Sequence, residues 1–215
     1  MRKLLMKEFR LALHPTVLIF WMLSAMLLIP NYPYYVITFY TALGLYFVCL
    51  TGRENHDIEY SLTLPVRKAD LVKARFVFAV IVEMVQLLIA IPFACVRQKM
   101  PLPGNLVGMD ANLAFFGFAL LLYGLFNRTF FAPFFRNPQK VGRVFAFTSI
   151  GVFVIICVLE AMAHAIPFVR DRLDTPDPAF LGEKLLVLAA GAFMYAVLTM
   201  WSYKKSKQNF ETLDL

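Results

Sequence analysis

Long apolar runs alternate with short polar stretches along this chain, and the alternation predicts a helical membrane protein. Six apolar segments approach the ~20 residues that a helix needs to cross the hydrocarbon layer. We expect spans at residues 15–31, 34–51, 75–96, 112–134, 144–167 and 184–203. In lipid every backbone N–H and C=O must be bonded within the segment, so helices are the expected form. The pattern lacks the alternation over about ten residues that marks a membrane β-strand.

The polar stretch between the second and third spans is the longest and most patterned. Ile58 and Leu62 are four apart on one helical face, which predicts a short surface helix over Arg53–Leu62. Pro65 cannot continue that helix. A second helix is expected after it, with Asp70 in its first turns, where the helix dipole favours an acid. We therefore expect residues 52–74 to form a rigid elbow, in which a short helix, a proline break and a second helix lead into the third span.

The residues before the first span, Met1–His14, predict an amphipathic helix that lies in the interfacial layer of the membrane. Its apolar side is expected to hold Leu5, Phe9, Ala12 and Leu13, and its basic side Lys3, Lys7 and Arg10. The alternative is an ordinary basic flank that only sets the orientation of the first span.

Composition supports a bilayer as the solvent of a single transmembrane domain over residues 1–215. Mean hydropathy is +0.67 and 16% of the residues are charged, against about 25% in soluble domains. The three cysteines, Cys49, Cys95 and Cys157, all lie in apolar runs without a spacing motif. A disulfide framework and a zinc site are therefore not expected.

The distribution of charge predicts the orientation. Sixteen of the 21 lysines and arginines fall at the two termini and in residues 52–75 and 127–143, and five in the loops 97–111 and 168–184. The positive-inside rule then places both termini in the cytoplasm. This rule accounts for the basic residues, so we expect no nucleic-acid partner.

Four polar side chains interrupt the apolar runs. Glu83 and Gln86 lie near the middle of the third span, and Glu160 and His164 in the outer half of the fifth. An ionisable group at the bilayer centre costs about 2.5–3.5 kcal/mol, so it should face protein or a wet cavity. Two interpretations stay open, a substrate or proton pathway and hydrogen bonding between helices.

Small residues that share a helical face predict close contacts between helices in lipid, within one subunit or against a second. The fourth and sixth spans carry such faces, formed by Ala114, Gly117 and Gly124 and by Ala189, Ala192 and Ala196.

Enzyme motifs are missing from the sequence. It contains no G-x-x-x-x-G-K-[ST], no H-E-x-x-H and no G-x-S-x-G. We therefore assign no catalytic residue and no metal site, and we do not expect the chain to be an enzyme.

The segment GRENHDIEYSLTLPVRKADLVKAR (Gly52–Arg75), the N-terminal KEFRLALHP (Lys7–Pro15) and the six spans together resemble the ABC-2 type membrane subunits of bacterial ABC transporters. The resemblance implies that the elbow holds a coupling helix that docks onto a separate ATPase subunit. It gives as docking candidates Glu54, Asp57, Ile58, Glu59, Tyr60 and Leu62. Where relatives often carry a capping serine or threonine, this chain has Arg67, so the cap is expected from Thr63 or from a shifted helix start.

The same resemblance implies an exporter in the bacterial cytoplasmic membrane. ATP and Mg²⁺ would bind to the partner ATPase and not to this chain. Two permease subunits, identical or paralogous, would join two ATPases, and the second and fifth spans would line the pathway. The basic residues of the elbow's second half would lie near lipid headgroups or complete the positive-inside pattern: Arg67, Lys68, Lys73 and Arg75. The aromatic-rich spans favour an amphipathic peptide, an antibiotic or a lipid-like molecule as cargo.

Two other functions remain open from the residues alone. One is a secondary transporter driven by an ion gradient, with Glu83 and Glu160 as proton sites. The other is a membrane sensor or assembly factor that does not transport and whose elbow binds a soluble partner.

Overall fold

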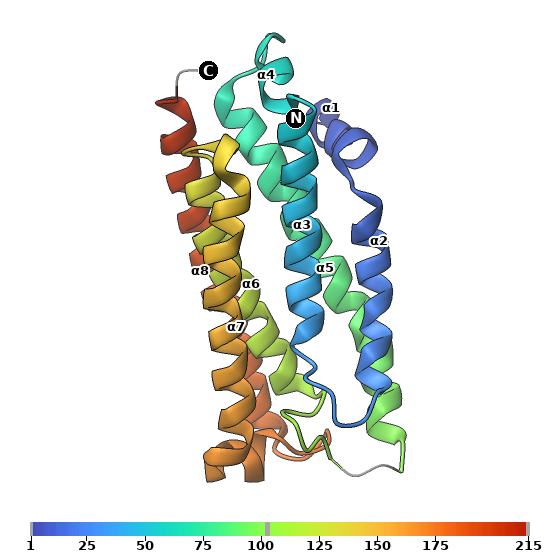
Figure 1. Ribbon diagram of the computed structural model, residues 1–215. Helices are drawn as coiled ribbons and strands as arrows, with labels where there is room; N and C mark the ends of the chain where they lie inside the picture. Colours follow the sequence, from blue (N-terminus) through green and yellow to red (C-terminus); the bar gives the residue numbers. More distant parts are fainter. Residues whose placement is uncertain (1, 102–103, 214–215) are drawn as a thin grey trace.

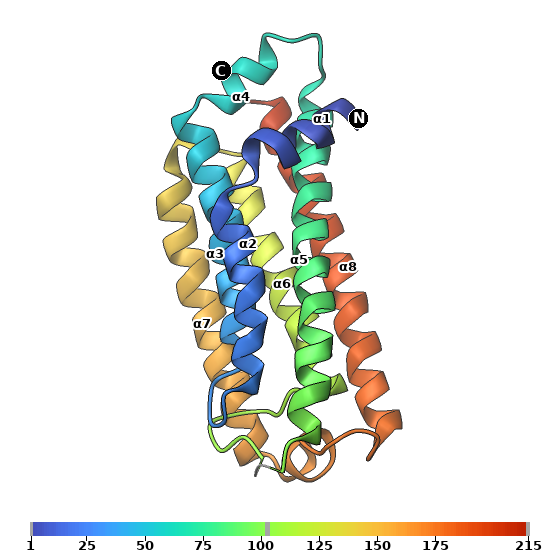
Figure 2. The same ribbon diagram turned by 90° about the vertical axis from the view of Figure 1, so that its right-hand side faces the viewer.

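The computed structural model describes residues 2–101 and 104–213, and it confirms an all-helical fold. Helices make up 81% of the chain, and no strand occurs in these ranges. The long helices run roughly along one axis, and both termini lie at the same end as the short helix α4 (Figure 1). We call this the terminal end. The opposite, far end holds the loops that precede α3, α6 and α8 (Figures 1 and 2).

Within the described ranges, five helices are long and apolar enough to cross a membrane, or six if a bent pair near the N-terminus counts as one span. The five are α3 (Val36–Glu54), α5 (Lys68–Lys99), α6 (Leu113–Phe134), α7 (Val141–Ala165) and α8 (Leu181–Glu211). Each overlaps one predicted span. Short 3₁₀ and π-helical turns, η3 (Pro138–Lys140) and η4 (Val169–Leu173), flank α7.

The first predicted span, 15–31, is shorter than expected. It consists of α2 (Pro15–Met22) and the 3₁₀ turn η2 (Leu23–Leu28). It ends there because Ile29 precedes a proline and is extended, with ψ 120°. Asn31 then adopts a left-handed φ of 55°.

The N-terminal segment is bent away from that span. It comprises α1 (Arg2–Lys7) and the π-helical turn η1 (Glu8–Ala12). Residues Lys3–Arg10 make an angle of 73° with Pro15–Leu28. Met1, the first residue of the predicted interfacial helix, lies outside the described residues. The apolar side chains predicted on one face pack against the core: Leu5, Phe9, Ala12 and Leu13.

The elbow is built from two helices, but its first helix is shorter than predicted. The helix α3 continues to Glu54, and α4 covers only Asp57–Leu62. His56 separates them because its backbone is left-handed, with φ 51° and ψ 35°.

The second helix of the elbow, α5, begins at Lys68 and runs without a break into the third span. Arg67 occupies the N-cap position and forms no side-chain cap. Thr63 does not supply one either, because its hydroxyl donates to the Tyr60 carbonyl at 2.8 Å. The start of α5 therefore lacks the side-chain cap that the resemblance implied.

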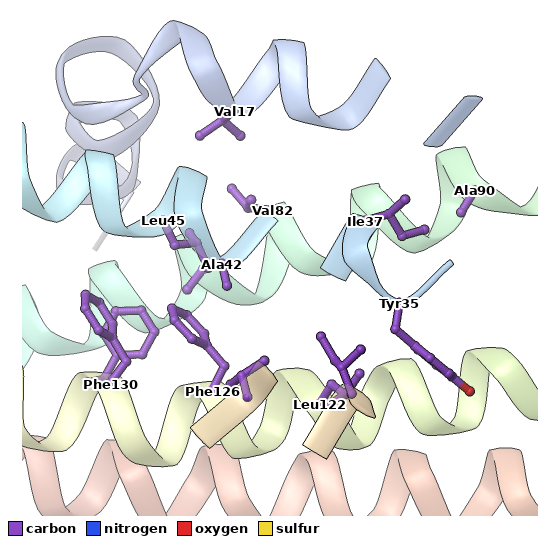
Figure 3. Close-up of a cluster of buried hydrophobic side chains, with 14 of the residues drawn as sticks. Val17, Tyr35, Ile37, Ala42, Leu45, Val82, Ala90, Leu122, Phe126 and Phe130 are labelled. Atoms are coloured by element: carbon purple, nitrogen blue, oxygen red, sulfur yellow. The ribbon is translucent and has the colours of Figure 1, made fainter. Parts of the chain in front are cut away.

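Aromatic side chains fill the core between α3, α5 and α6. Phe126 and Phe130 extend from α6 into the space beside Ala42, Leu45 and Val82 (Figure 3). The two phenyl rings stack with centroids 5.0 Å apart. This packing fixes α3 and α5, the two helices that enter and leave the elbow.

The closest helix contact is between α6 and α8, and glycines make it possible. A methyl group on Gly117 would lie 2.6 Å from the Val187 carbonyl oxygen, and one on Gly191 would collide with the backbone of Gly117. The predicted glycines of α6 thus face α8. The alanine face of α8 does not take part, because Ala189, Ala192 and Ala196 are exposed.

The outer helices α7 and α8 present apolar surface that this chain leaves uncovered. Only 28% and 22% of their most apolar windows are buried, against 61% for α6. Lipid or another subunit must cover these faces.

Candidate functional site

A compact set of ion pairs joins the elbow to the rest of the chain. Asp57 of α4 forms an ion pair with Lys7 Nζ at 2.6 Å and accepts a hydrogen bond from Arg75 Nη2 at 2.9 Å. Arg75 Nε also forms an ion pair with Glu8 Oε2 at 3.1 Å, and Lys7 donates a hydrogen bond to Ser61 Oγ at 2.8 Å. We call these five residues the elbow cluster. It ties α4 to the N-terminal segment and to α5.

The charges of the elbow cluster balance and are largely withdrawn from water. The side chains of Glu8 and Arg75 are 4% and 7% exposed. Two carboxylates face two cations, so the desolvation of each ion is offset only while its partners stay in place. Lys7 and Arg75 therefore point into the protein, whereas the sequence had placed them on the basic face and near headgroups. The reason is the packing of α4 and of the π-helical turn against α5.

Outside this cluster, part of α4 and of the residues that flank it is exposed. Tyr60 is 65% and Leu64 42% exposed, and Glu54 is exposed as well. Two of the predicted docking residues, Ile58 and Leu62, instead pack against the core.

The remaining two predicted docking residues lie between these extremes. Asp57 belongs to the elbow cluster. Glu59 is half-buried and accepts a hydrogen bond from Gln139 at 3.2 Å, which connects α4 to η3. Of the predicted docking residues, Glu54 and Tyr60 are thus exposed, and the turn around Leu64 adds to that surface.

A polar cluster in the middle of the bundle centres on Glu83. One oxygen of its carboxyl group, Oε2, accepts from Tyr195 at 2.6 Å and from Asn127 at 3.1 Å. Asn127 also donates to Thr199 at 3.1 Å. The other oxygen, Glu83 Oε1, has no partner among the described residues. The cluster joins α5, α6 and α8.

Gln86 does not belong to that cluster. It donates to Ser24 at 2.7 Å, one turn of α5 away from a bond between Trp21 Nε1 and the Val82 carbonyl at 3.1 Å. These bonds hold the first predicted span against α5. Glu83 and Gln86 thus serve different helix contacts and form no joint site.

Glu160 and His164 lie together at one edge of an open groove between α3 and α7 near the far end. The groove has a volume of about 630 Å³, and its wall includes Phe39, Tyr40, Phe153 and Ile156. We call it the side groove. His164 is exposed, whereas Glu160 is buried and accepts from the Met109 backbone at 3.0 Å.

The loops of the far end form a hydrogen-bonded cap. Asp174 accepts from the Asp110 backbone at 2.7 Å, and Asn112 donates to the Leu173 carbonyl at 2.7 Å. The buried Lys184 pairs with Asp177 at 3.0 Å. Burial raises the pKa of Asp174 to about 6, although the hydrogen bond from Asp110 opposes the shift.

Several of these contacts had no signal in the sequence. Glu8 looks like one more charge in a basic segment, and Asn127 and Tyr195 look like ordinary polar residues of apolar runs. For Asn127 and Tyr195, the one available signal was the hydrogen-bonding requirement of Glu83, because a buried carboxyl group needs partners on neighbouring helices.

These features define the class of protein. It is a multi-pass helical membrane protein whose polar groups join its helices at both ends and at mid-depth. The chain matches the family described as ABC-2 family transporter protein over residues 3–211. It therefore belongs to this family, as the elbow motif had predicted, and is a membrane component of an ABC transporter. No curated protein and no solved structure matches it.

Proposed function

We propose that the chain is the permease subunit of an ATP-driven exporter and that a separate ATPase docks on its elbow. One observation carries the proposal: the elbow has an exposed outer surface at and just after α4, and its inner side is held by ion pairs. Tyr60 and Leu64 are exposed, while Asp57 holds Lys7 and Arg75. An aromatic anchor with charged neighbours suits a transient protein interface.

The elbow cluster supports a mechanism for coupling. A partner that moves α4 displaces Asp57, and Asp57 is bonded to Arg75 at 2.9 Å. Because Arg75 lies on the same continuous helix as Glu83, motion at the elbow passes into the membrane along α5. ATP and Mg²⁺ would remain in the partner, which closes and opens as it hydrolyses ATP.

The terminal end is proposed to face the bacterial cytoplasm, on the strength of the sixteen basic residues predicted on that side. The ATPase would then meet the elbow from the cytoplasm. A second permease, the same chain or a paralogue, would cover part of the apolar surface that α7 and α8 leave free.

The side groove supports the choice of pathway and cargo. It lies between α3 and α7, the second and fifth predicted spans, and its wall is mainly aromatic and aliphatic, with Glu160 and His164 as polar groups. An amphipathic peptide, an antibiotic or a lipid-like molecule suits such a wall. Vesicles that move only small hydrophilic solutes would contradict this part of the proposal.

The test of docking is co-purification of the tagged chain from its host membrane. We expect a P-loop ATPase with the wild type and none with Tyr60→Asp/Leu64→Asp. The matched control is Leu106→Asp, which charges a 72% exposed leucine in the loop before α6 and should leave the ATPase bound.

Each outcome of the co-purification either supports or contradicts docking on the elbow. Because Tyr60 and Leu64 are exposed, both variants should keep the elution profile and melting temperature of the wild type. Loss of the ATPase only from the elbow variant supports docking on the elbow, whereas an ATPase retained by that variant, or absent from the folded wild type, overturns it. Transport that persists without ATP and stops in Glu83→Gln would instead favour the ion-driven alternative.

A further inference from the structure

A second groove opens between α6 and α7 at the terminal end. It has a volume of about 660 Å³, and none of its lining residues belongs to the elbow cluster or the side groove. Its polar part holds Arg136, Lys140 and Arg143, and no aspartate or glutamate lines it. We call it the basic groove.

The three cations of the basic groove are not neutralised by the protein. Arg136, Lys140 and Arg143 are exposed, and none pairs with a carboxylate in the part of the chain that the structure describes. At the same end, Arg75 is held by Glu8 and Asp57. The groove therefore concentrates uncompensated positive charge, which favours an anionic ligand.

The groove changes from charged to apolar along α7. Arg143, Phe147 and Gly151 follow one another at four-residue intervals and so share a helical face. Phe147 is 72% exposed, and nothing lies within 4 Å of the position that a Cβ on Gly151 would take. Leu125 and Ile155 complete the apolar wall. The charged part lies toward the end of the bundle and the apolar part toward its middle.

We propose that the basic groove binds an anionic phospholipid from the leaflet at the terminal end. The phosphate would lie among Arg136, Lys140 and Arg143, and an acyl chain would run past Phe147 and Gly151. Guanidinium groups bind phosphate through paired, charge-assisted hydrogen bonds. Basic pockets between membrane helices are suited to lipid headgroups. The site is separate from the docking and transport proposed above and does not depend on them.

The test is native mass spectrometry of the purified full chain, titrated with dioleoylphosphatidylglycerol or dioleoylphosphatidylcholine. We expect the wild type to prefer phosphatidylglycerol by at least about tenfold. Arg136→Gln/Lys140→Gln/Arg143→Gln should lose the preference. The matched control Lys204→Gln/Lys205→Gln/Lys207→Gln removes the same charge near the terminal end of α8 and should keep it.

A second variant tests the acyl-chain part. Gly151→Phe fills the open wall without a clash in the protein, so phosphatidylglycerol binding should weaken by about tenfold while the melting temperature is unchanged. Gly151→Ala, which leaves most of the space open, should bind like the wild type.

Four results would overturn the proposal. Equal loss of preference in both triple variants means diffuse surface charge. Equally tight phosphatidylcholine means a merely apolar groove. Displacement of the lipid by millimolar inorganic phosphate means a site for a soluble anion. A stable dimer that Phe147→Ser dissociates means that a second copy covers the groove.

Discussion

Arg75 illustrates how a single side chain near the end of a span can carry a large share of local stability. It is 6% exposed and lies between Glu8 and Asp57. Arg75→Gln removes one of the two cations that face Glu8 and Asp57, and breaking a buried ion pair in this way costs about 3–5 kcal/mol. We expect a clear drop in the melting temperature in detergent, followed by the fluorescence of a thiol-reactive dye at Cys49, which is buried nearby.

The matched control is Arg67→Gln. Arg67 also pairs with an aspartate, Asp70, at 2.9 Å, but its side chain is 83% exposed. Water screens such a pair, so the melting temperature should not change. Equal effects of the two substitutions would show that the elbow cluster does not hold the elbow.

Asp174 makes the far-end cap sensitive to pH. Its pKa, raised by burial to about 6, lies above the ordinary value of about 3.9. The folded cap therefore binds this proton more tightly than the unfolded segment does, and its stability falls as the pH rises from about 4 to about 6. After correction for the intrinsic exchange rate, which itself rises with pH, residues 166–180 should be more strongly protected from hydrogen exchange at pH 5 than at pH 7, and Asp174→Asn should reduce the difference in protection.

Neighbouring groups sharpen that experiment. Burial also raises the pKa of Asp110, so this group too makes the stability of the cap fall as the pH rises. Lys184 and His164 favour the charged form of Asp174, so they lower its pKa and partly oppose the effect of burial. Asp174→Asn/Asp110→Asn should therefore flatten the response further than either single change. An unchanged pH response in the double variant would mean that another group is responsible.

Side-chain partners set the limit of what could be predicted at this scale. Counting lysines and arginines by segment separates the two ends of the bundle, but it cannot distinguish Arg75, which is buried, from Lys73, which is exposed. The pairing with Glu8 depends on a contact between segments far apart in the sequence. The intramembrane position of Glu83 was predictable, whereas its partners Asn127 and Tyr195 were not.

At the scale of elements, the contact between α6 and α8 makes the sharpest prediction. Gly191→Ala puts a methyl group against the backbone of Gly117 and must separate the two helices. Overpacking of this kind costs about 1–3 kcal/mol, so the melting temperature should fall. Circular dichroism of the purified chain in detergent measures it.

Gly151→Ala is the matched control for that prediction. It makes the same chemical change inside α7, where no atom beyond the adjacent residues and the surrounding helix backbone lies within 4 Å of the added methyl carbon. Alanine is also the better helix former, so stability should stay constant or rise slightly. If Gly191→Ala were equally harmless, the close approach of α6 and α8 would be wrong.

Helices were more predictable than their contacts, for a physical reason. A run of apolar residues long enough to cross the membrane must form a helix, and all five long helices overlap predicted spans. The first span was overestimated because Pro30 and Pro33 lie inside or beside the apolar run and end the helix early. The alanine face of α8 makes no helix contact within this chain, because alanine is small enough for an interface but is just as acceptable to lipid; its packing against a second subunit stays a prediction.

For the molecule as a whole, α5 is the element that connects all depths of the bundle. Arg75 joins it to the elbow, Glu83 to α6 and α8, and Gln86 to Ser24. At the far end Arg97 donates to Tyr34 at 2.8 Å. A displacement of α5 along its axis would disturb contacts at both ends, as the proposed coupling requires. The family was predictable from the elbow motif, but this continuous connection was not.

The elbow cluster also constrains the order in which the segments of the protein can fold during synthesis. Ser61, to which Lys7 donates, leaves the ribosome 54 residues after Lys7, and Arg75 follows later still. Chains are made from the N-terminus, so Glu8 and Lys7 wait in the aqueous or headgroup layer while two apolar segments are inserted. The N-terminal segment can settle only when the third segment has arrived. The N-terminal segment therefore docks only after the first three apolar segments have been inserted correctly. A bulky tag fused close to Lys7 would interfere with this docking.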